Sequence, residues 1–285
     1  DEILQAYMED VGKHNPELFR SFHYGEEIDG FHETVHLTLK LSDNEVLVCG
    51  SGFEGEARIL RRGEDGLWNY DSERINGFND NVSSTLKLSD NEVLVCDFSR
   101  KTRILHKGED GSWNYDGDNI DGYGDIIFST LKLSDNEVLV CSNDGETRIL
   151  RKGEDGLWNY DSNSIDGFDS AVHSTLKLSD SEVLVCGGRL GSETRILHKG
   201  EDGLWNYGSD SIDGFDGTIY STLKLSDSEV LVCGGNYGDE TRILRKGEDG
   251  LWNYDSNSID GIDGVVHSTL KLSDNEVLVF GGGRE

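Results

Sequence analysis

The chain has 285 residues and a formal net charge of −30, with 26 Lys and Arg against 56 Asp and Glu. This charge excludes electrostatic binding to nucleic acid or to an anionic membrane surface, because both require a positively charged patch. Membrane insertion is not expected either, since no apolar run approaches the roughly 20 residues of a spanning helix. The apolar fraction of 35% is low for a single deep core.

The N-terminal region contains two short strand-like segments separated by an insertion. Glu2–Leu4 matches the segment RIL, and Phe22–Tyr24 matches the segment WNY, both of which recur later in the chain. Residues 5–21 lie between them and have no counterpart elsewhere. The sequence therefore predicts two strands here and leaves the form of the insertion open.

A repeat of 45–47 residues fills the rest of the chain. The motif LKLSD begins at six leucines, namely Leu39, Leu86, Leu131, Leu176, Leu223 and Leu270. Each complete unit reads HSTLKLSD, SEVLVCGG, ETRILRKGEDG and LWNYDSNSIDGF in turn. Apolar and β-branched runs bounded by turn formers predict four short strands per unit, A to D. Four strands in a unit of this length are typical of a β-propeller blade.

The C-terminus ends after an A strand at Val266–Leu272 and a B strand at Glu276–Phe280. The two N-terminal segments supply the missing C and D strands. We therefore predict an all-β, six-bladed β-propeller of four-stranded antiparallel blades, with the sixth blade closed by two strands from each terminus. Closure of this kind removes exposed sheet edges. The whole chain, residues 1–285, is expected to form one monomeric domain with the insertion inside the closing blade.

The run Val266–Gly282 combines an A strand ending in an apolar-x-Asp turn, a V-L-V strand and a glycine doublet. The doublet recurs as Gly187-Gly188 and Gly234-Gly235, whereas Asp97 and Ser142 replace it in two other units. This pattern resembles the kelch-type repeat, especially the bacterial form related to the propeller domain of galactose oxidase. The resemblance implies a propeller with an interaction role. No copper-ligand set accompanies it.

The repeats differ from one another mainly in two sets of loops. The A–B and C–D turns are nearly constant, whereas the B–C and D–A loops vary and carry most of the negative charge. Both variable sets emerge on the same side of an antiparallel blade, which we call the upper face. Because rigid scaffolds commonly present recognition residues on loops, this face is predicted to bind a basic or cationic protein. Drift in unconstrained loops and acidic solubilising surface are the alternatives.

Three groups of upper-face residues are the predicted contacts. The apolar loop residues are Phe53, Phe98 and Tyr237, and the acidic residues are Asp213, Asp216 and Asp260. A third group occupies one position at the start of strand A, which reads His36, Ser83, Phe128, His173, Tyr220 and His267. From this position we select the histidines and the tyrosine, His36, His173, Tyr220 and His267, as lining the mouth of the central channel. Zinc is disfavoured there, because zinc ligands must approach within about 2.1 Å of the ion.

One D–A segment suggests a calcium site. It places four oxygen-bearing side chains close together in sequence, at Asp161, Asn163, Asp166 and Asp169. Calcium takes six to eight oxygen ligands, although Asx turns and solvated carboxylates explain the same residues without a metal. No other cofactor is expected.

Five cysteines occupy equivalent B-strand positions, at Cys49, Cys96, Cys141, Cys186 and Cys233. Equivalent positions in neighbouring blades lie too far apart for a disulfide. The cysteines are therefore predicted to be small apolar core residues. This favours a reducing, intracellular compartment.

The sequence contains no nucleophile motif and no phosphate-binding loop that leads into a helix. The arginines that recur once per strand C suit structural salt bridges better than a catalytic cluster. We therefore predict a non-enzymatic protein–protein interaction scaffold. A multivalent, lectin-like carbohydrate-binding propeller is the alternative, and a kelch-like enzyme with an unrecognised site is the third choice.

Overall fold

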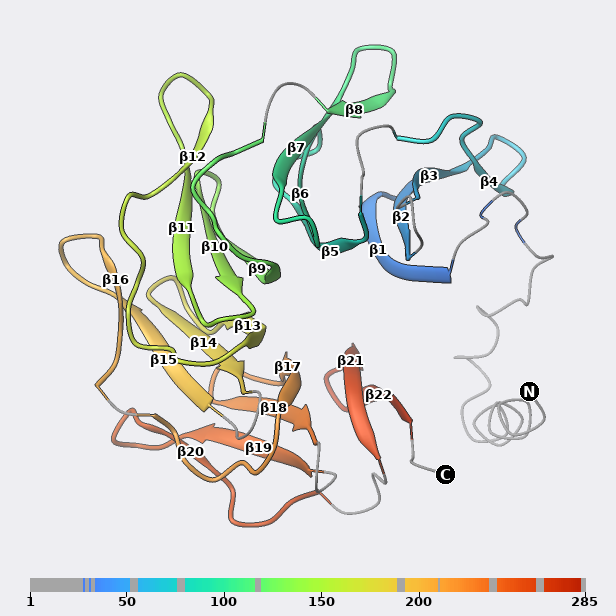
Figure 1. Ribbon diagram of the computed structural model, residues 1–285. Helices are drawn as coiled ribbons and strands as arrows, with labels where there is room; N and C mark the ends of the chain where they lie inside the picture. Colours follow the sequence, from blue (N-terminus) through green and yellow to red (C-terminus); the bar gives the residue numbers. More distant parts are fainter. Residues whose placement is uncertain are drawn as a thin grey trace, which may run out of the picture.

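The computed structural model describes residues 28, 31, 34–51, 56–75, 80–115, 119–188, 193–209, 211–235, 240–259 and 264–282. These residues form antiparallel sheets arranged around a central axis, one sheet for each repeat (Figure 1). The described part of the chain contains no helix, and hence none long and apolar enough to cross a membrane.

Each sheet follows the chain from the axis outward, so strands A to D of the repeat are four adjacent strands. The innermost strands are β1 (Thr34–Ser42), β5 (Val82–Lys87), β9 (Ile127–Ser134), β13 (Val172–Lys177), β17 (Ile219–Lys224) and β21 (Val265–Ser273). The second strands are β2 (Glu45–Ser51), β6 (Glu92–Asp97), β10 (Glu137–Ser142), β14 (Glu182–Gly187), β18 (Glu229–Gly234) and β22 (Glu276–Gly282).

The third and fourth strands are described in five of the sheets. The third strands are β3 (Ala57–Arg62), β7 (Thr102–Lys107), β11 (Thr147–Lys152), β15 (Glu193–Lys199) and β19 (Glu240–Lys246). The outer strands are three residues long, at β4 (Trp68–Tyr70), β8 (Trp113–Tyr115), β12 (Trp158–Tyr160), β16 (Trp205–Tyr207) and β20 (Trp252–Tyr254). We number the sheets as blades 1 to 6 in chain order, so β21 and β22 belong to blade 6.

The predicted six-bladed all-β propeller is confirmed. Five sheets have four strands and the sixth has two in the described part of the chain. The predicted strands Glu2–Leu4 and Phe22–Tyr24 and the insertion at residues 5–21 lie outside the described residues.

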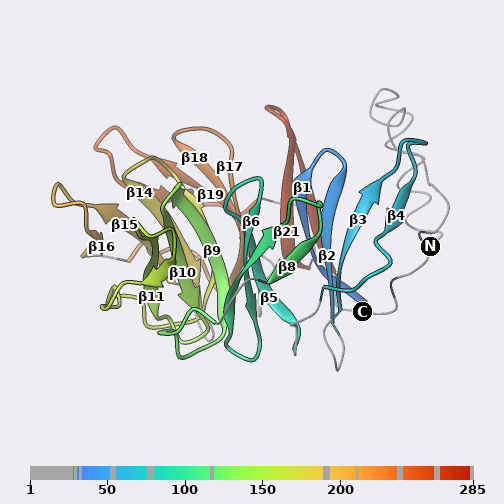
Figure 2. The same cartoon turned by 90° about the horizontal axis from the view of Figure 1, so that it is seen from above.

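The order of the strands places the loops of each blade at opposite ends. Because consecutive strands are antiparallel neighbours, the A–B and C–D turns share one end of a blade, and the B–C and D–A loops share the other. The side view in Figure 2 shows these two ends of the ring. The prediction that both variable loop sets lie on one upper face is therefore correct, and we call the opposite end the lower face.

The hydrophobic core is divided into separate layers between neighbouring blades. In one layer, Leu139 and Cys141 of blade 3 pack with Val183, Leu197 and Trp205 of blade 4. Equivalent layers lie between blades 1 and 2, 2 and 3, 4 and 5, and 5 and 6. Because each layer is only one side chain thick on either sheet, a low overall apolar content is sufficient. The predicted packing role of the recurrent tryptophans is confirmed.

Polar contacts repeat between the blades as well. The Ser129 hydroxyl of blade 3 lies 2.8 Å from the Thr175 hydroxyl of blade 4. At the lower end of β13, Lys177 Nζ donates to the Leu133 carbonyl at 3.0 Å. Farther out, Lys199 Nζ lies 2.9 Å from Glu137 Oε2. These contacts join residues 44–62 positions apart in sequence, so they hold neighbouring blades together.

The glycine doublets have a steric cause. A Cβ at Gly187 would lie 1.9 Å from the carbonyl oxygen of Ala171, the residue before β13. The next residue, Gly188, has φ +123°, a conformation that side-chain-bearing residues rarely adopt. The doublet therefore lets strands A and B approach closely where the B–C loop begins.

Candidate functional site

The residues at the start of the inner strands share a backbone feature. In blade 4, Val172 pairs with Gly187 and Ser174 pairs with Cys186, so His173 is the extra residue of a β-bulge. The same register shift singles out the equivalent residue of every described inner strand, namely His36, Ser83, Phe128, Tyr220 and His267. Bulges commonly redirect side chains next to functional sites. The position identified in the sequence is thus the bulge position of each blade.

Four of these bulge residues form a continuous chain of ring contacts at the upper end of the axis. Phe128 stacks on His173 with centroids 5.6 Å apart and an interplanar angle of 19°. His173 contacts Tyr220 at 5.5 Å, and Tyr220 contacts His267 at 5.2 Å. Phe98, from the B–C loop of blade 2, contacts Phe128 at 6.2 Å. We call these five residues the axial arc.

The side chains at this position contact their neighbours along the ring of blades, which the sequence did not predict. The bulges carry the rings of four successive blades within contact distance. Phe128 belongs to the arc although it was not selected as a contact residue, and it lies beside the selected His173. His36 is a bulge residue of β1 with an exposed side chain.

His173 has the most distinctive environment in the arc. It is half-buried, and burial lowers its pKa below the ordinary value of 6.5, whereas a hydrogen bond with the Gly188 backbone raises it. The imidazole is therefore neutral at pH 7. A neutral imidazole carries its proton on one ring nitrogen, and its other nitrogen is basic. A neutral imidazole between aromatic faces is suited to act as a general base.

A carboxylate on a nearby part of the chain is also distinctive. Asp125 lies on the loop that leads into β9, three residues before Phe128. Its Oδ2 atom is buried without a hydrogen-bond partner among the described residues. The sequence did not single out Asp125, because many aspartates occupy the D–A loops and only burial distinguishes this one.

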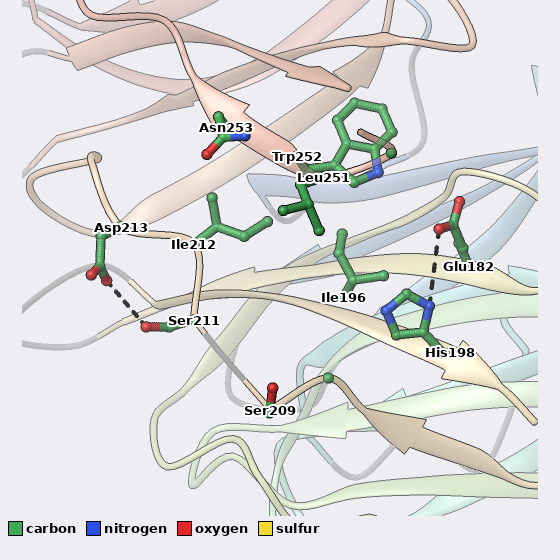
Figure 3. Close-up of a pocket in the computed structure, with 12 residues that line it drawn as sticks. Glu182, Ile196, His198, Ser209, Ser211, Ile212, Asp213, Leu251, Trp252 and Asn253 are labelled. Carbon is green, nitrogen blue, oxygen red and sulfur yellow. Dashed lines mark hydrogen bonds and ion pairs between the residues drawn. The ribbon is translucent and has the colours of Figure 1, made fainter. Parts of the chain in front are cut away.

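The predicted acidic contacts lie apart from one another. Asp213 lines a cavity at the outer rim of blades 4 and 5, where it accepts a hydrogen bond from Ser211 Oγ at 3.1 Å (Figure 3). Asp216 is exposed, and its backbone N–H donates to Glu240. Phe53, Tyr237 and Asp260 lie outside the described residues.

The structure gives the calcium hypothesis no support. Asp161 Oδ2 lies 2.9 Å from Arg151 Nε, and Asp166 accepts a hydrogen bond from Ser164. Within the described ranges, no group of three or more His, Cys, Asp or Glu side chains is placed to hold a metal ion. Of the predicted set Asp161, Asn163, Asp166 and Asp169, the carboxylates of Asp161 and Asp166 thus already have protein partners.

Four arginines at the upper ends of the third strands each pair with a glutamate. Arg148 Nε lies 2.7 Å from Glu146 Oε1, and Arg195 Nε lies 2.9 Å from Glu193 Oε1. Arg58 pairs with Glu56 and Arg242 with Glu240 in the same way. The predicted structural role of these arginines is confirmed.

The five cysteines are buried and free, as predicted. Burial raises the pKa of Cys141 and Cys186 to about 12, so these thiols are protonated at physiological pH. They are core residues and supply no nucleophile.

No family model matches the sequence, and no curated protein matches it significantly. Solved structures do match the fold. A 6-phosphogluconolactonase candidate from Bacteroides uniformis ATCC 8492 superposes with a TM-score of 0.67 at 12% identity, covering 83% of this chain and 74% of that one. The gluconolactonase PpgL from the periplasm of Pseudomonas aeruginosa gives 0.56 at 13%, covering 76% and 66%. The WD40 β-propeller domain of Doa1 gives 0.53 at 14%, covering 89% and 91%.

These likenesses establish the propeller fold and do not single out the kelch type. They also contradict the prediction of a non-enzymatic binding module, because several of the similar propellers are named as lactonases, which are enzymes. The prediction relied on the absence of a nucleophile motif. Hydrolysis of a strained cyclic ester by water needs a general base and no protein nucleophile, so that absence did not exclude an enzyme.

Proposed function

We propose that this protein hydrolyses a small cyclic ester, an unphosphorylated sugar lactone, at the upper end of the propeller axis. The observation that carries the proposal is the axial arc, in which the neutral imidazole of His173 lies between Phe128 and Tyr220. The names of the similar propellers, 6-phosphogluconolactonase and gluconolactonase, supply the reaction class.

The reaction needs little from the protein beyond a positioned base and a surface for the ring. The basic nitrogen of His173 takes a proton from water as the water oxygen bonds to the lactone carbonyl carbon. The ring C–O bond then breaks, and its oxygen takes a proton to give the open-chain hydroxy acid. Aromatic side chains on either side of the base offer apolar faces for the carbon skeleton of the sugar.

The charge of the upper face selects between the two substrate types. A phosphorylated lactone carries close to two negative charges and needs a cluster of unengaged cations. Arg148 and Arg195 are already paired with glutamates, and the surrounding loops are acidic. A neutral lactone avoids this repulsion, so we favour the unphosphorylated substrate.

The test is lactone hydrolysis followed by acid release at constant pH, with the spontaneous rate subtracted. Wild-type protein should accelerate hydrolysis of gluconolactone more than that of its 6-phosphate. His173→Gln should lower kcat by about 100-fold or more, the usual contribution of a general base. The matched control is His106→Gln at the lower end of β7, which should leave kcat unchanged.

Two results would contradict the proposal. If neither lactone is hydrolysed faster than in buffer, the assigned reaction class is wrong. If His173→Gln keeps full activity, the protein is a lactonase whose base lies elsewhere.

We also retain a kelch-type relationship as a proposal. Its support is the recurring glycine doublet and the close strand approach that requires it at Gly187 and Gly234. A sequence family that links this repeat to kelch proteins through intermediates would test it.

A further inference from the structure

A cavity of about 500 Å³ lies at the outer rim between blades 4 and 5 (Figure 3). Blade 4 contributes Glu182 from β14, Ile196 and His198 from β15, and the segment that follows β16. Blade 5 contributes Gly250 together with the first residues of β20. Figure 3 shows His198 facing Glu182 on one side of the cavity. We call this the rim cavity.

The equivalent place in blade 1 is occupied by an arginine side chain. Arg61 pairs through Nη1 with Glu45 of the second strand, and its Nε lies 2.9 Å from Asp71, the residue after the outer strand. Its Nη2 donates to the Gly111 carbonyl of blade 2 at 2.7 Å. One guanidinium thus joins a glutamate, an aspartate and a glycine carbonyl of the next blade.

Blades 3 and 5 repeat the carboxylate part of this arrangement. Arg151 pairs with Glu137 and Asp161, and Arg245 pairs with Glu229 and Asp255. The guanidinium position is therefore occupied in three of the described blades.

Blade 2 also has a histidine, His106, in place of the arginine, but there Lys152 Nζ of blade 3 lies 2.9 and 2.8 Å from the two carboxylate oxygens of Glu92. Blade 4 retains the glutamate and the glycine carbonyl and lacks the guanidinium. The arginine is replaced by His198 and the aspartate by Gly208, whereas the glutamate remains as Glu182 and the glycine of the next blade remains as Gly250. All four residues line the rim cavity. The cavity therefore coincides with the position that Arg61 occupies in blade 1.

The remaining glutamate is only partly engaged. Glu182 Oε2 pairs with Lys246 Nζ of blade 5 at 2.8 Å, as Glu45 and Glu137 pair with the equivalent lysines. Its Oε1 atom, which in those two blades accepts from arginine, instead lies 3.9 Å from His198 Nδ1. In blades 1 and 3 this glutamate oxygen accepts a hydrogen bond from the arginine. In blade 4 the equivalent oxygen, Glu182 Oε1, can accept from another donor.

We infer that the rim cavity binds a guanidinium cation carried on an apolar stem, such as the arginine side chain of a peptide. Glu182 Oε1 and the Gly250 carbonyl take the roles that Glu45 and Gly111 have toward Arg61. Asp213, exposed at the cavity wall, adds a further negative charge. Ile196, Ile212 and Leu251 line the same cavity and pack against the stem. A cavity of this size falls in the range of small-ligand sites and exceeds what a bare ion would fill.

The site is distinct from the axial arc, because it lies at the outer strands whereas the arc lies at the inner strands. It has no part in the proposed hydrolysis, so either proposal can fail without the other.

The probe is N-acetyl-arginine amide, titrated into the 285-residue protein by calorimetry. The first control is N-acetyl-citrulline amide, which has nearly the same shape without the charge. The second is N-acetyl-lysine amide, which keeps the charge but lacks the planar guanidinium group with its several N–H donors. We expect binding of the arginine compound only. Binding of the citrulline compound with equal affinity, or no binding of the arginine compound at millimolar concentration, would overturn the inference.

Variants at equivalent positions of blades 3 and 4 test the inference. Glu182→Gln should weaken binding about tenfold or more, since a charge-assisted hydrogen bond is lost. The double variant His198→Arg with Gly208→Asp rebuilds the blade 3 arrangement and should abolish binding. Gly208 accepts a Cβ, because the nearest atom would be 3.6 Å away, and blade 3 shows that the restored pair folds.

The reverse exchange gives the sharpest readout. Arg151→His with Asp161→Gly copies the blade 4 residues into blade 3 and should add one equivalent of arginine-compound binding relative to wild type. Circular dichroism would confirm that the variant is folded. If the folded variant binds the same number of arginine-compound molecules as wild type, the missing arginine does not create the site. Retained binding in the filled His198→Arg, Gly208→Asp protein would show the same.

Discussion

The ion pairs between blades predict that one substitution has different costs at two equivalent positions. Glu137 and Glu229 both begin the second strand of a blade, and both pair with an arginine of their own blade. Glu137 also pairs with Lys199 of the next blade at 2.9 Å. Its side chain is 11% exposed, against 33% for Glu229. The perturbation is the same at each position, Glu→Gln.

The magnitude follows from burial and from the number of partners. At Glu137, glutamine keeps one acceptor oxygen and loses the charge between two cations, so one charge-assisted bond is lost and the other is weakened. Since each such bond contributes about 1.5–3 kcal/mol, Glu137→Gln should reduce the free energy of unfolding by about 2–3 kcal/mol. Glu229→Gln removes a more exposed pair and should cost less than about 1 kcal/mol.

Urea denaturation followed by circular dichroism measures both costs. The midpoint should shift while the slope stays constant, because a change in slope would signal a different unfolding transition. At about 1 M salt the Glu229 effect should vanish, and the Glu137 effect should largely remain, since buried pairs are screened less. Equal costs at the two positions would refute the conclusion that the inter-blade pair stabilises the ring.

Three further predictions concern the glycine doublet, the bulge histidine and the thiols. Gly187→Ala should lower the free energy of unfolding by about 2–4 kcal/mol, because the added Cβ would overlap the Ala171 carbonyl. In the control Gly153→Ala, the close contact of the added Cβ is with the Asp155 side chain, which can move. Thermal denaturation should therefore show a smaller loss of stability for Gly153→Ala. Because burial lowers the pKa of His173 below 6.5, the unfolded chain binds more protons just below that pH. Stability should therefore fall as the pH drops below 6.5 and fall less in His173→Gln, as urea titrations at pH 7.5 and 5.5 would show. The buried thiols should resist alkylation in native buffer and react fully in urea, and rapid labelling of the native protein would contradict their placement in the core.

Sequence periodicity was sufficient for the architecture. The recurrent LKLSD and WNY segments mark the end of the inner strand and the outer strand. In the fourth blade, β13 ends at Lys177 within LKLSD, and β16 covers WNY. The glycine doublets were recognised as a pattern. Their cause, the approach of the Ala171 carbonyl to Gly187, is a contact between strands and is visible only in three dimensions.

The candidate site was predicted in part. One column of the repeat contained His173 and Tyr220, and the structure shows that this column is the bulge position. Ring contact between successive blades was not foreseen, because the bulges, and not the residue types, bring the rings together. Asp125 was missed for a related reason, since its burial depends on the surrounding loops.

The sequence by itself determined the number of repeats, the strands within each repeat and the excess of negative charge, because each of these is a property of local pattern and composition. Only the tertiary structure decided which side chains of neighbouring repeats meet. Lys199 and Glu137 lie 62 positions apart, and near-identical residues occur in other blades, so local sequence cannot assign the pair. The rim cavity has the same origin. His198 and Gly208 look like unrelated variations along the chain, and the fold places them where an arginine and its paired aspartate lie in three other blades.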